Sequence, residues 1–143
     1  PTLCGPLSLL HYKSFAAAPS LAKMRIRYEE EFSEYLKWGI HVMVSQTELG
    51  ELTIGDSHEY GPGTEPFDKN FINEMILTYL GSFTHFPGIA LTETWHGNYA
   101  KLTNGDSFII REIEKDVMLF NGLGGAGMTL SFGLADRIFA HLS

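Results

Sequence analysis

Residues 122–135 read GLGGAGMTLSFGLA and carry three glycines at the spacing G-x-G-x-x-G, namely Gly122, Gly124 and Gly127. A run of strand formers at 117–120 precedes these glycines, and a helical pattern follows them. A glycine-rich turn between a strand and a helix occurs in several quite different folds. The residues around this turn therefore decide which class of fold the sequence predicts.

A dinucleotide-binding turn of this kind is followed by a helix, a returning parallel strand and an acidic residue about 20 positions on. Here Asp136 falls inside the helix, and the sequence stops at Ser143, so we expect no βαβ unit. A phosphate-binding loop would require Gly-Lys-Ser/Thr after the glycines, and that motif is missing from the stretch. We interpret the dinucleotide match as accidental.

Two other roles for these glycines remain open. Glycines at the start of a helix let the backbone approach a flat or anionic ligand, to which the first turn offers N–H groups and a positive dipole end. Alternatively, the glycines form a tight turn that needs positive φ angles.

The rest of the sequence predicts short strands interspersed with helices. Strand patterns cover 7–15, 40–46, 52–57, 89–102, 108–111 and 117–120, and amphipathic helices are expected over 20–36, from 68 until before Pro87, and over 126–141. The adjacent strands favour hairpins at 40–57 and 108–120. We therefore predict an α+β fold, with an antiparallel or mixed β-sheet and helices packed on it.

Composition narrows the class of protein. The 143 residues are 44% hydrophobic, enough for a single domain over 1–143. The net charge of −7 argues against nucleic acid or an anionic membrane surface as a partner. One cysteine, Cys4, excludes an internal disulfide framework, and no apolar run reaches membrane-spanning length. These features predict a cytoplasmic protein.

Three segments together resemble a known superfamily. They are GLGGAGMT at 122–129, IGDSHE at 54–59, and WHGNY at 95–99 followed by Asp106. Their order and spacing resemble the FAD-dependent D-amino-acid oxidase, glycine oxidase and sarcosine oxidase superfamily. The wider matches HYKSFAAAPSL, WGIHVMVSQ and ELTIGDSHEYG resemble a subfamily associated with phosphonate metabolism.

The resemblance implies FAD as cofactor and assigns parts of the chain to it. Residues 1–105 would be the substrate-binding portion, and 106–143 the terminal hairpin and helix of the flavin-binding part. The ADP half of FAD would bind a dinucleotide-binding domain N-terminal to this sequence, as a missing partner. The residues whose backbone would contact the flavin ring are Gly124, Gly125, Ala126, Gly127, Met128 and Thr129.

The resemblance also suggests substrate-binding residues. In many superfamily members an arginine of the Trp-x-Gly-x-Arg segment clamps the substrate carboxylate, but Tyr99 stands at that position here. Lys101, two residues on, would face the same side of a strand and suits a phosphonate-type anion. The candidate substrate contacts are His11, Lys13, His41, Tyr99 and Lys101. The scattered histidines show no ligand spacing, so no metal is predicted.

The expected function is the substrate-binding portion of an FAD-dependent oxidoreductase that oxidatively deaminates a small amine or amino acid, with an aminophosphonate as a specific candidate. On its own the chain is expected to be inactive and to bind FAD weakly. The alternative is a stand-alone module that binds a small anionic metabolite without redox chemistry. A structural domain without a site is the third option.

Overall fold

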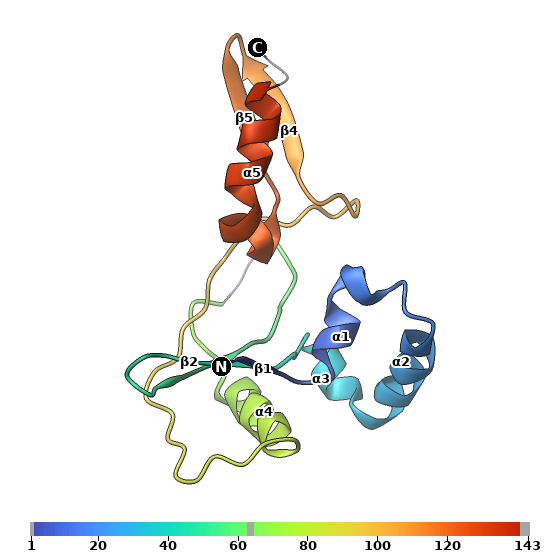
Figure 1. The fold of residues 1–143 in the computed structure, drawn as a ribbon, viewed down its shortest axis with the longest axis vertical. Helices are drawn as coiled ribbons and strands as arrows, with labels where there is room; N and C mark the ends of the chain where they lie inside the picture. The colour runs from blue at the N-terminus through green and yellow to red at the C-terminus, as the bar shows by residue number, and fades with distance from the viewer. Residues whose placement is uncertain (1, 63–64, 141–143) are drawn as a thin grey trace. The chain divides into compact units, whose positions relative to one another are not determined.

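The computed structural model describes residues 2–62 and 65–140, and it divides the chain into two compact units, Pro1–Trp95 and His96–Ser143 (Figure 1). Each unit contains an antiparallel sheet and at least one helix, which confirms the predicted α+β class. None of the described helices is long and apolar enough to cross a membrane.

The first unit combines a three-stranded sheet with several helices. Its elements are β1 (Thr2–Cys4), α1 (Ser8–His11), the 3-10 helix η1 (Lys13–Phe15), α2 (Ser20–Glu31), α3 (Ser33–Lys37), β2 (Met43–Gln46), β3 (Leu52–Gly55) and α4 (Asn70–Gly81). The strands lie in the order β1-β2-β3, all antiparallel, with Val44 opposite both Leu3 and Ile54. The predicted hairpin at 40–57 is confirmed.

The core of this unit lies between the sheet and α4. Residues at a spacing of two on the segment that enters β2 point inward, and residues at three- and four-residue steps on α4 meet them, as the two periodicities require. The buried apolar side chains are Leu7, Ile40, Val42, Val44, Ile72, Ile76, Tyr79 and Leu80. This core positions both strands of the hairpin.

The helix predicted over 20–36 forms in two pieces. Phe32 leaves the helical conformation, with φ −133° and ψ 32°, and so separates α2 from α3. The break lets the Phe32 ring pack edge-on against Tyr79 of α4, with the ring centroids 5.8 Å apart. Packing against the core has therefore overridden a continuous helical pattern.

The strand predicted at 7–15 is wrong, because this segment forms α1 and η1. Leu7 and Ser8 are buried at the start of α1, and the Leu7 N–H donates to the Tyr79 hydroxyl at 3.0 Å. The short strand of this region is β1, before Pro6. The hydrogen-bond partner of this backbone N–H lies 72 residues along the chain, so a pattern within the segment cannot reveal it.

The second unit consists of a hairpin followed by a helix. Its elements are β4 (Ile109–Glu114), β5 (Val117–Asn121), the 3-10 helix η2 (Gly124–Ala126) and α5 (Gly127–Ala140). β4 and β5 pair antiparallel, which confirms the predicted hairpin at 108–120. The helix predicted over 126–141 is confirmed as α5 up to Ala140, and residue 141 lies outside the described residues.

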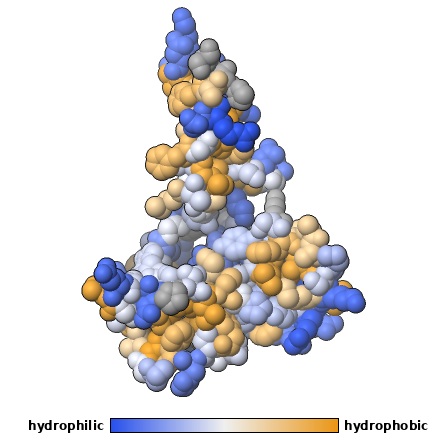
Figure 2. All heavy atoms as spheres, in the orientation of Figure 1, coloured by the Kyte–Doolittle hydropathy of each residue, from blue (hydrophilic) through white to orange (hydrophobic). Residues whose placement is uncertain are grey.

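Large apolar side chains remain exposed on α5. Met128 is 92% exposed and Phe132 82%, and Figure 2 shows apolar atoms at the surface of this unit. The start of α5 thus presents an apolar face around the glycine-rich turn.

The strand predicted at 89–102 is also wrong. Residues 91–100 are exposed and form no strand; at Lys101 one isolated antiparallel bridge joins the chain to Leu123. A strand is stable only when its backbone pairs with a neighbour, and the sequence of the segment does not contain that neighbour.

Candidate functional site

Gly122 and Gly124 are required by the backbone of the turn. Their φ angles are +87° and +59°, which L-residues with side chains rarely adopt. A Cβ on Gly122 would also lie 3.0 Å from Cγ of Leu102. The tight-turn role therefore accounts for these two glycines.

Gly125 and Gly127 are not required in this way. Neither has a positive φ, and Gly127 has ordinary helical angles of −55° and −47°. A Cβ on Gly127 would lie 3.9 Å from Cβ of Leu123, an ordinary contact, and one on Gly125 would lie 3.6 Å from the Tyr99 hydroxyl. The fold leaves room for a side chain at both positions.

A hollow of about 480 Å³ lies beside this turn, in the size range of ligand sites. Four predicted residues line it: Gly124, Gly127 and Met128 of the cofactor set, and Tyr99 of the substrate set. The other lining residues are Ala100, Phe120, Asn121, Leu123, Ser131 and Phe132. The wall is therefore largely apolar, with an amide and a hydroxyl among its polar groups.

The start of η2 and α5 adds a polar edge to this hollow. η2 leads directly into α5, and the N–H groups at the start of a helix have no preceding helical carbonyl to bind. The Ala126 N–H donates to the Leu123 carbonyl at 3.3 Å. The dipole of the 14-residue α5 favours an electron-rich group at this end.

The remaining predicted residues of this unit lie around the turn. Gly125, Ala126 and Thr129 are exposed and do not line the hollow. Lys101 is exposed, and its backbone bridges to Leu123. Because 91–100 forms no strand, strand alternation does not place Tyr99 and Lys101 on one face.

In the first unit three histidines lie together. His11 ends α1, His41 precedes β2, and His58 follows β3, and one nitrogen of each lies within 4.8 Å of those of the other two. The ring centroids are 4.0 Å apart for His11 and His41, 4.5 Å for His11 and His58, and 5.0 Å for His41 and His58. Of the predicted residues, the structure thus brings together His11 and His41.

Backbone pairing beyond the hairpin positions two of these rings. The His41 N–H donates to the Asp56 carbonyl at 3.1 Å, and the Asp56 N–H donates to the His41 carbonyl at 2.8 Å. Farther on, the His58 N–H donates to the Trp38 carbonyl at 3.0 Å. The ladder therefore continues past β2 and β3 and holds His41 and His58 at the open end of the hairpin.

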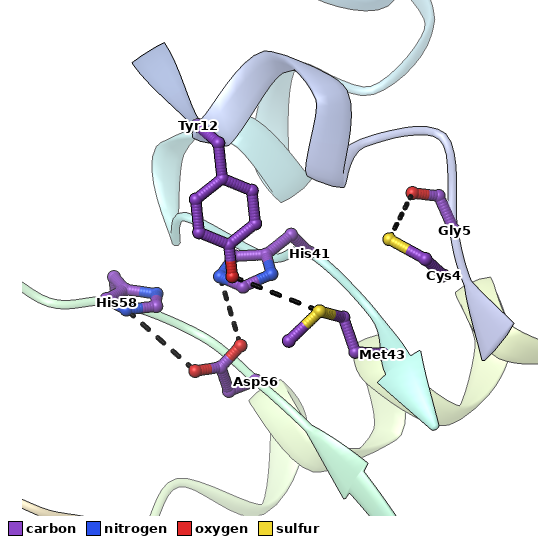
Figure 3. A network of polar contacts seen from close by, with 7 residues as sticks. All are labelled: Cys4, Gly5, Tyr12, His41, Met43, Asp56 and His58. Carbon is purple, nitrogen blue, oxygen red and sulfur yellow. Dashed lines mark hydrogen bonds and ion pairs between the residues drawn. The ribbon is translucent and has the colours of Figure 1, made fainter. Parts of the chain in front are cut away.

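The Asp56 carboxylate lies between two of the rings (Figure 3). Its Oδ1 is 3.0 Å from Nε2 of His41, and its Oδ2 is 3.8 Å from Nε2 of His58. Burial raises the pKa of Asp56, against the opposing effect of His58. His41 is 2% exposed, and neither of its ring nitrogens forms a hydrogen bond among the described residues, so Asp56 contacts Nε2 without hydrogen-bonding to it.

Burial, with a further contribution from the neighbouring His11 and His58, lowers the pKa of His41 to about 3. His41 is therefore neutral at pH 7 and adds no positive charge for binding a substrate anion. Lys13, the other predicted contact in this unit, begins η1, and its side chain lies outside the described part of the structure.

Sequence reasoning missed the grouping of His58 with His11 and His41. The three residues are separated by 30 and 17 positions, far from any metal-ligand spacing. A partial signal was present in the hairpin: counting back equally along both strands from its turn places 41 beside 57, which lies between Asp56 and His58. The observed pairing of His41 with Asp56 is shifted from this register by one residue. Nothing in the sequence indicated that His11 would join them, because its segment reads as a strand.

The chain was compared with models of protein families, with curated proteins and with solved structures, and the family models gave a match. A model of the family described as FAD dependent oxidoreductase matches residues 15–141, a range that includes the hairpin of the first unit and the glycine turn of the second. The searches of curated proteins and of solved structures gave no match.

Proposed function

The chain belongs to the FAD dependent oxidoreductase family, and we propose that it forms the flavin-ring and substrate portion of an enzyme that oxidatively deaminates a small amine. The observation that carries the proposal is the pair of glycines, Gly125 and Gly127, that the fold itself does not require. They lie at a helix start, and Gly127 lines an apolar hollow. Because the backbone does not require glycine at these two positions, the lack of a side chain there is explained by a flat ligand that must approach the backbone closely.

The described residues fit the ring end of FAD. The apolar wall formed by Phe120, Leu123 and Met128 suits an aromatic ring system, and the helix-start N–H groups suit a ring edge that becomes electron-rich. Bound flavin would supply the two-electron acceptor for the amine. In the proposal the chain's own groups orient that ring and exclude water from its face.

The nucleotide end of FAD is assigned to other residues. Binding of the ADP half needs a βαβ unit, and both sheets in the described residues are antiparallel. In the proposal the 143-residue chain by itself therefore binds FAD weakly and is inactive. Titration of the isolated chain with FAD tests this point, and tight stoichiometric binding with a yellow product would contradict it.

For the substrate we propose a small amine with an anionic head, of the aminophosphonate type. Tyr99 lines the hollow, and Lys101 lies beside the turn through its bridge to Leu123. A lysine ammonium binds a phosphonate as a point charge, whereas a planar arginine guanidinium matches a carboxylate through two parallel hydrogen bonds. Tyr99 stands at the position where the resembled Trp-x-Gly-x-Arg segment carries that arginine. This arrangement favours a phosphonate over a carboxylate.

The test begins with the protein as its own cell makes it. Its visible spectrum, intact mass and flavin content per chain are measured, and purified protein is then assayed for amine-dependent flavin reduction with aminophosphonates and the matching amino acids. Flavin near one per chain and faster reduction by the aminophosphonate support the proposal. A colourless protein would reject the flavin assignment, and equal reduction by the carboxylates would reject the substrate class.

A matched pair of variants locates the ring. Gly127→Leu places a side chain in the wall of the hollow, whereas Gly133→Leu makes the same change on α5 at a position with open space around its Cβ. Leucine favours a helix over glycine by up to about 1 kcal/mol, so neither variant should unfold α5. We expect flavin content to fall at least about 10-fold in the first variant only, and equal content in both would refute the location.

A further inference from the structure

We propose that His11, His41 and His58 form a binding site for a divalent transition-metal ion of the Zn²⁺ class, with Asp56 as the carboxylate that orients His41. The inference rests on the histidine cluster alone and does not depend on the proposed function. It replaces direct substrate contact as the role of His11 and His41. It also departs from the sequence-based prediction of no metal.

The three side chains supply the ligand set that such ions take. Imidazole nitrogen is a preferred ligand of Zn²⁺, Cu²⁺ and Ni²⁺, and three histidines leave a fourth position open for water or another oxygen ligand. The donor atoms converge from the end of α1 and from both sides of the hairpin. Three elements that are distant in sequence thus contribute one nitrogen each.

The surroundings of His41 point to a metal rather than to an ordinary buried histidine. Metal-binding histidines almost always place their second ring nitrogen against a carboxylate or carbonyl. Here Nε2 of His41 lies 3.0 Å from Oδ1 of Asp56, and neither buried ring nitrogen of His41 forms a hydrogen bond among the described residues. A buried nitrogen without a hydrogen bond costs free energy, and coordination would remove that cost.

The separation of the donor atoms is close to what binding needs. With Zn–N distances of about 2.0–2.1 Å, tetrahedral geometry sets neighbouring nitrogens about 3.3 Å apart. The present separations are up to 4.8 Å. His11 and His58 are only partly buried, so rotation of these two rings can bring their nitrogens closer to each other and to that of the buried His41.

The experiment measures metal directly, without flavin or activity. The protein is purified at its natural length by a tag without histidine, stripped with a chelator and titrated with Co²⁺ and then Zn²⁺. We expect one Co²⁺ per chain with the intense visible absorption of a four-coordinate site, and displacement of Co²⁺ by one equivalent of Zn²⁺. A Co²⁺ spectrum like that of the free ion, or no saturable binding, would overturn the proposal.

Variants separate the site from the fold. His58→Gln removes a ligand at a partly exposed position, and Asp56→Asn keeps the shape of the orienting side chain while removing its charge. Loss of such an outer carboxylate costs about 10–100-fold in metal affinity, and loss of a ligand at least as much. His85→Gln, in the same unit but outside the cluster, is the control and should bind as the unaltered protein does.

The urea unfolding curves of the metal-free variants show whether each is folded. If folded His58→Gln and Asp56→Asn bind Co²⁺ as tightly as His85→Gln does, the cluster is not the site and the proposal fails. If the metal binds but no flavin is found, the proposed function fails and this inference stands.

Discussion

The hydrogen bond between the Leu7 N–H and the Tyr79 hydroxyl joins the start of α1 to α4 across the core. The donor and acceptor are 3.0 Å apart, and both residues are almost completely buried, at 1% and 4% exposed. Tyr79→Phe keeps the ring and removes the acceptor, so a buried N–H loses its partner. That loss costs about 1–3 kcal/mol in the free energy of unfolding at neutral pH.

The same hydroxyl predicts how this cost changes with pH. Burial raises the pKa of Tyr79 from 10.0 to about 12, although the Leu7 N–H acts in the opposite direction. Between these two values the unfolded chain loses the phenol proton before the folded chain does. The stability that Tyr79 contributes is therefore complete below pH 10 and is lost as the pH rises toward 12.

At pH 11 the loss amounts to about 1 kcal/mol, because one pKa unit corresponds to that order of free energy. The Phe variant has no phenol at this position and escapes the loss. The destabilisation caused by Tyr79→Phe should therefore shrink by about 1 kcal/mol between pH 9 and pH 11.

The assay is urea unfolding followed by far-UV circular dichroism at both pH values. Tyr35→Phe is the control, since its ring lies 5.7 Å from that of Tyr79 and belongs to the same aromatic group. Its effect should stay within about 0.5 kcal/mol. A constant destabilisation by Tyr79→Phe at both pH values would refute the reasoning about ionisation, and no destabilisation would refute the hydrogen bond.

Two further predictions concern packing in the first unit and use the same unfolding assay. Gly5→Ala should destabilise by about 1–3 kcal/mol, because a Cβ would lie 2.9 Å from Cζ of Phe83, whereas Gly81→Ala, with open space around its Cβ, should not. Leu7→Ala should cost about 2–5 kcal/mol, while Leu49→Ala, at a position 86% exposed, should change stability by less than about 0.5 kcal/mol. Equal effects within either pair would contradict the assigned packing.

The elements that were predicted correctly have strong local signals. Helix α4 shows apolar residues at three- and four-residue steps, and β2 and β3 flank a short polar turn. The glycine turn was located correctly between β5 and α5 as well. In each case the residues that define the element lie within a few positions of one another, so a short window contains the information.

The segments that were predicted incorrectly depend on contacts with residues far away in the sequence. The segment 7–15 mixes apolar and polar residues as a strand would, yet it forms α1 and η1, and the Leu7 N–H at its start binds the hydroxyl of Tyr79, far along the chain. The segment 89–102 is rich in strand formers but has no strand paired along its length in the described structure, apart from the single bridge at Lys101. Strand formation depends on a partner, and a propensity cannot supply one.

Local patterns in the chain were enough to predict the α+β class, the two hairpins, the glycine turn ahead of the last helix and the resemblance to FAD-dependent oxidoreductases. Two features became evident from the folded chain alone. His11, His41 and His58 meet beside Asp56, and Gly127 lines a hollow although its backbone would accept a side chain. Periodicity and turn chemistry act between neighbours in the chain, so they can be read from the sequence. The meeting of groups 17 and 30 residues apart depends on hairpin register and core packing, which form only when the chain folds.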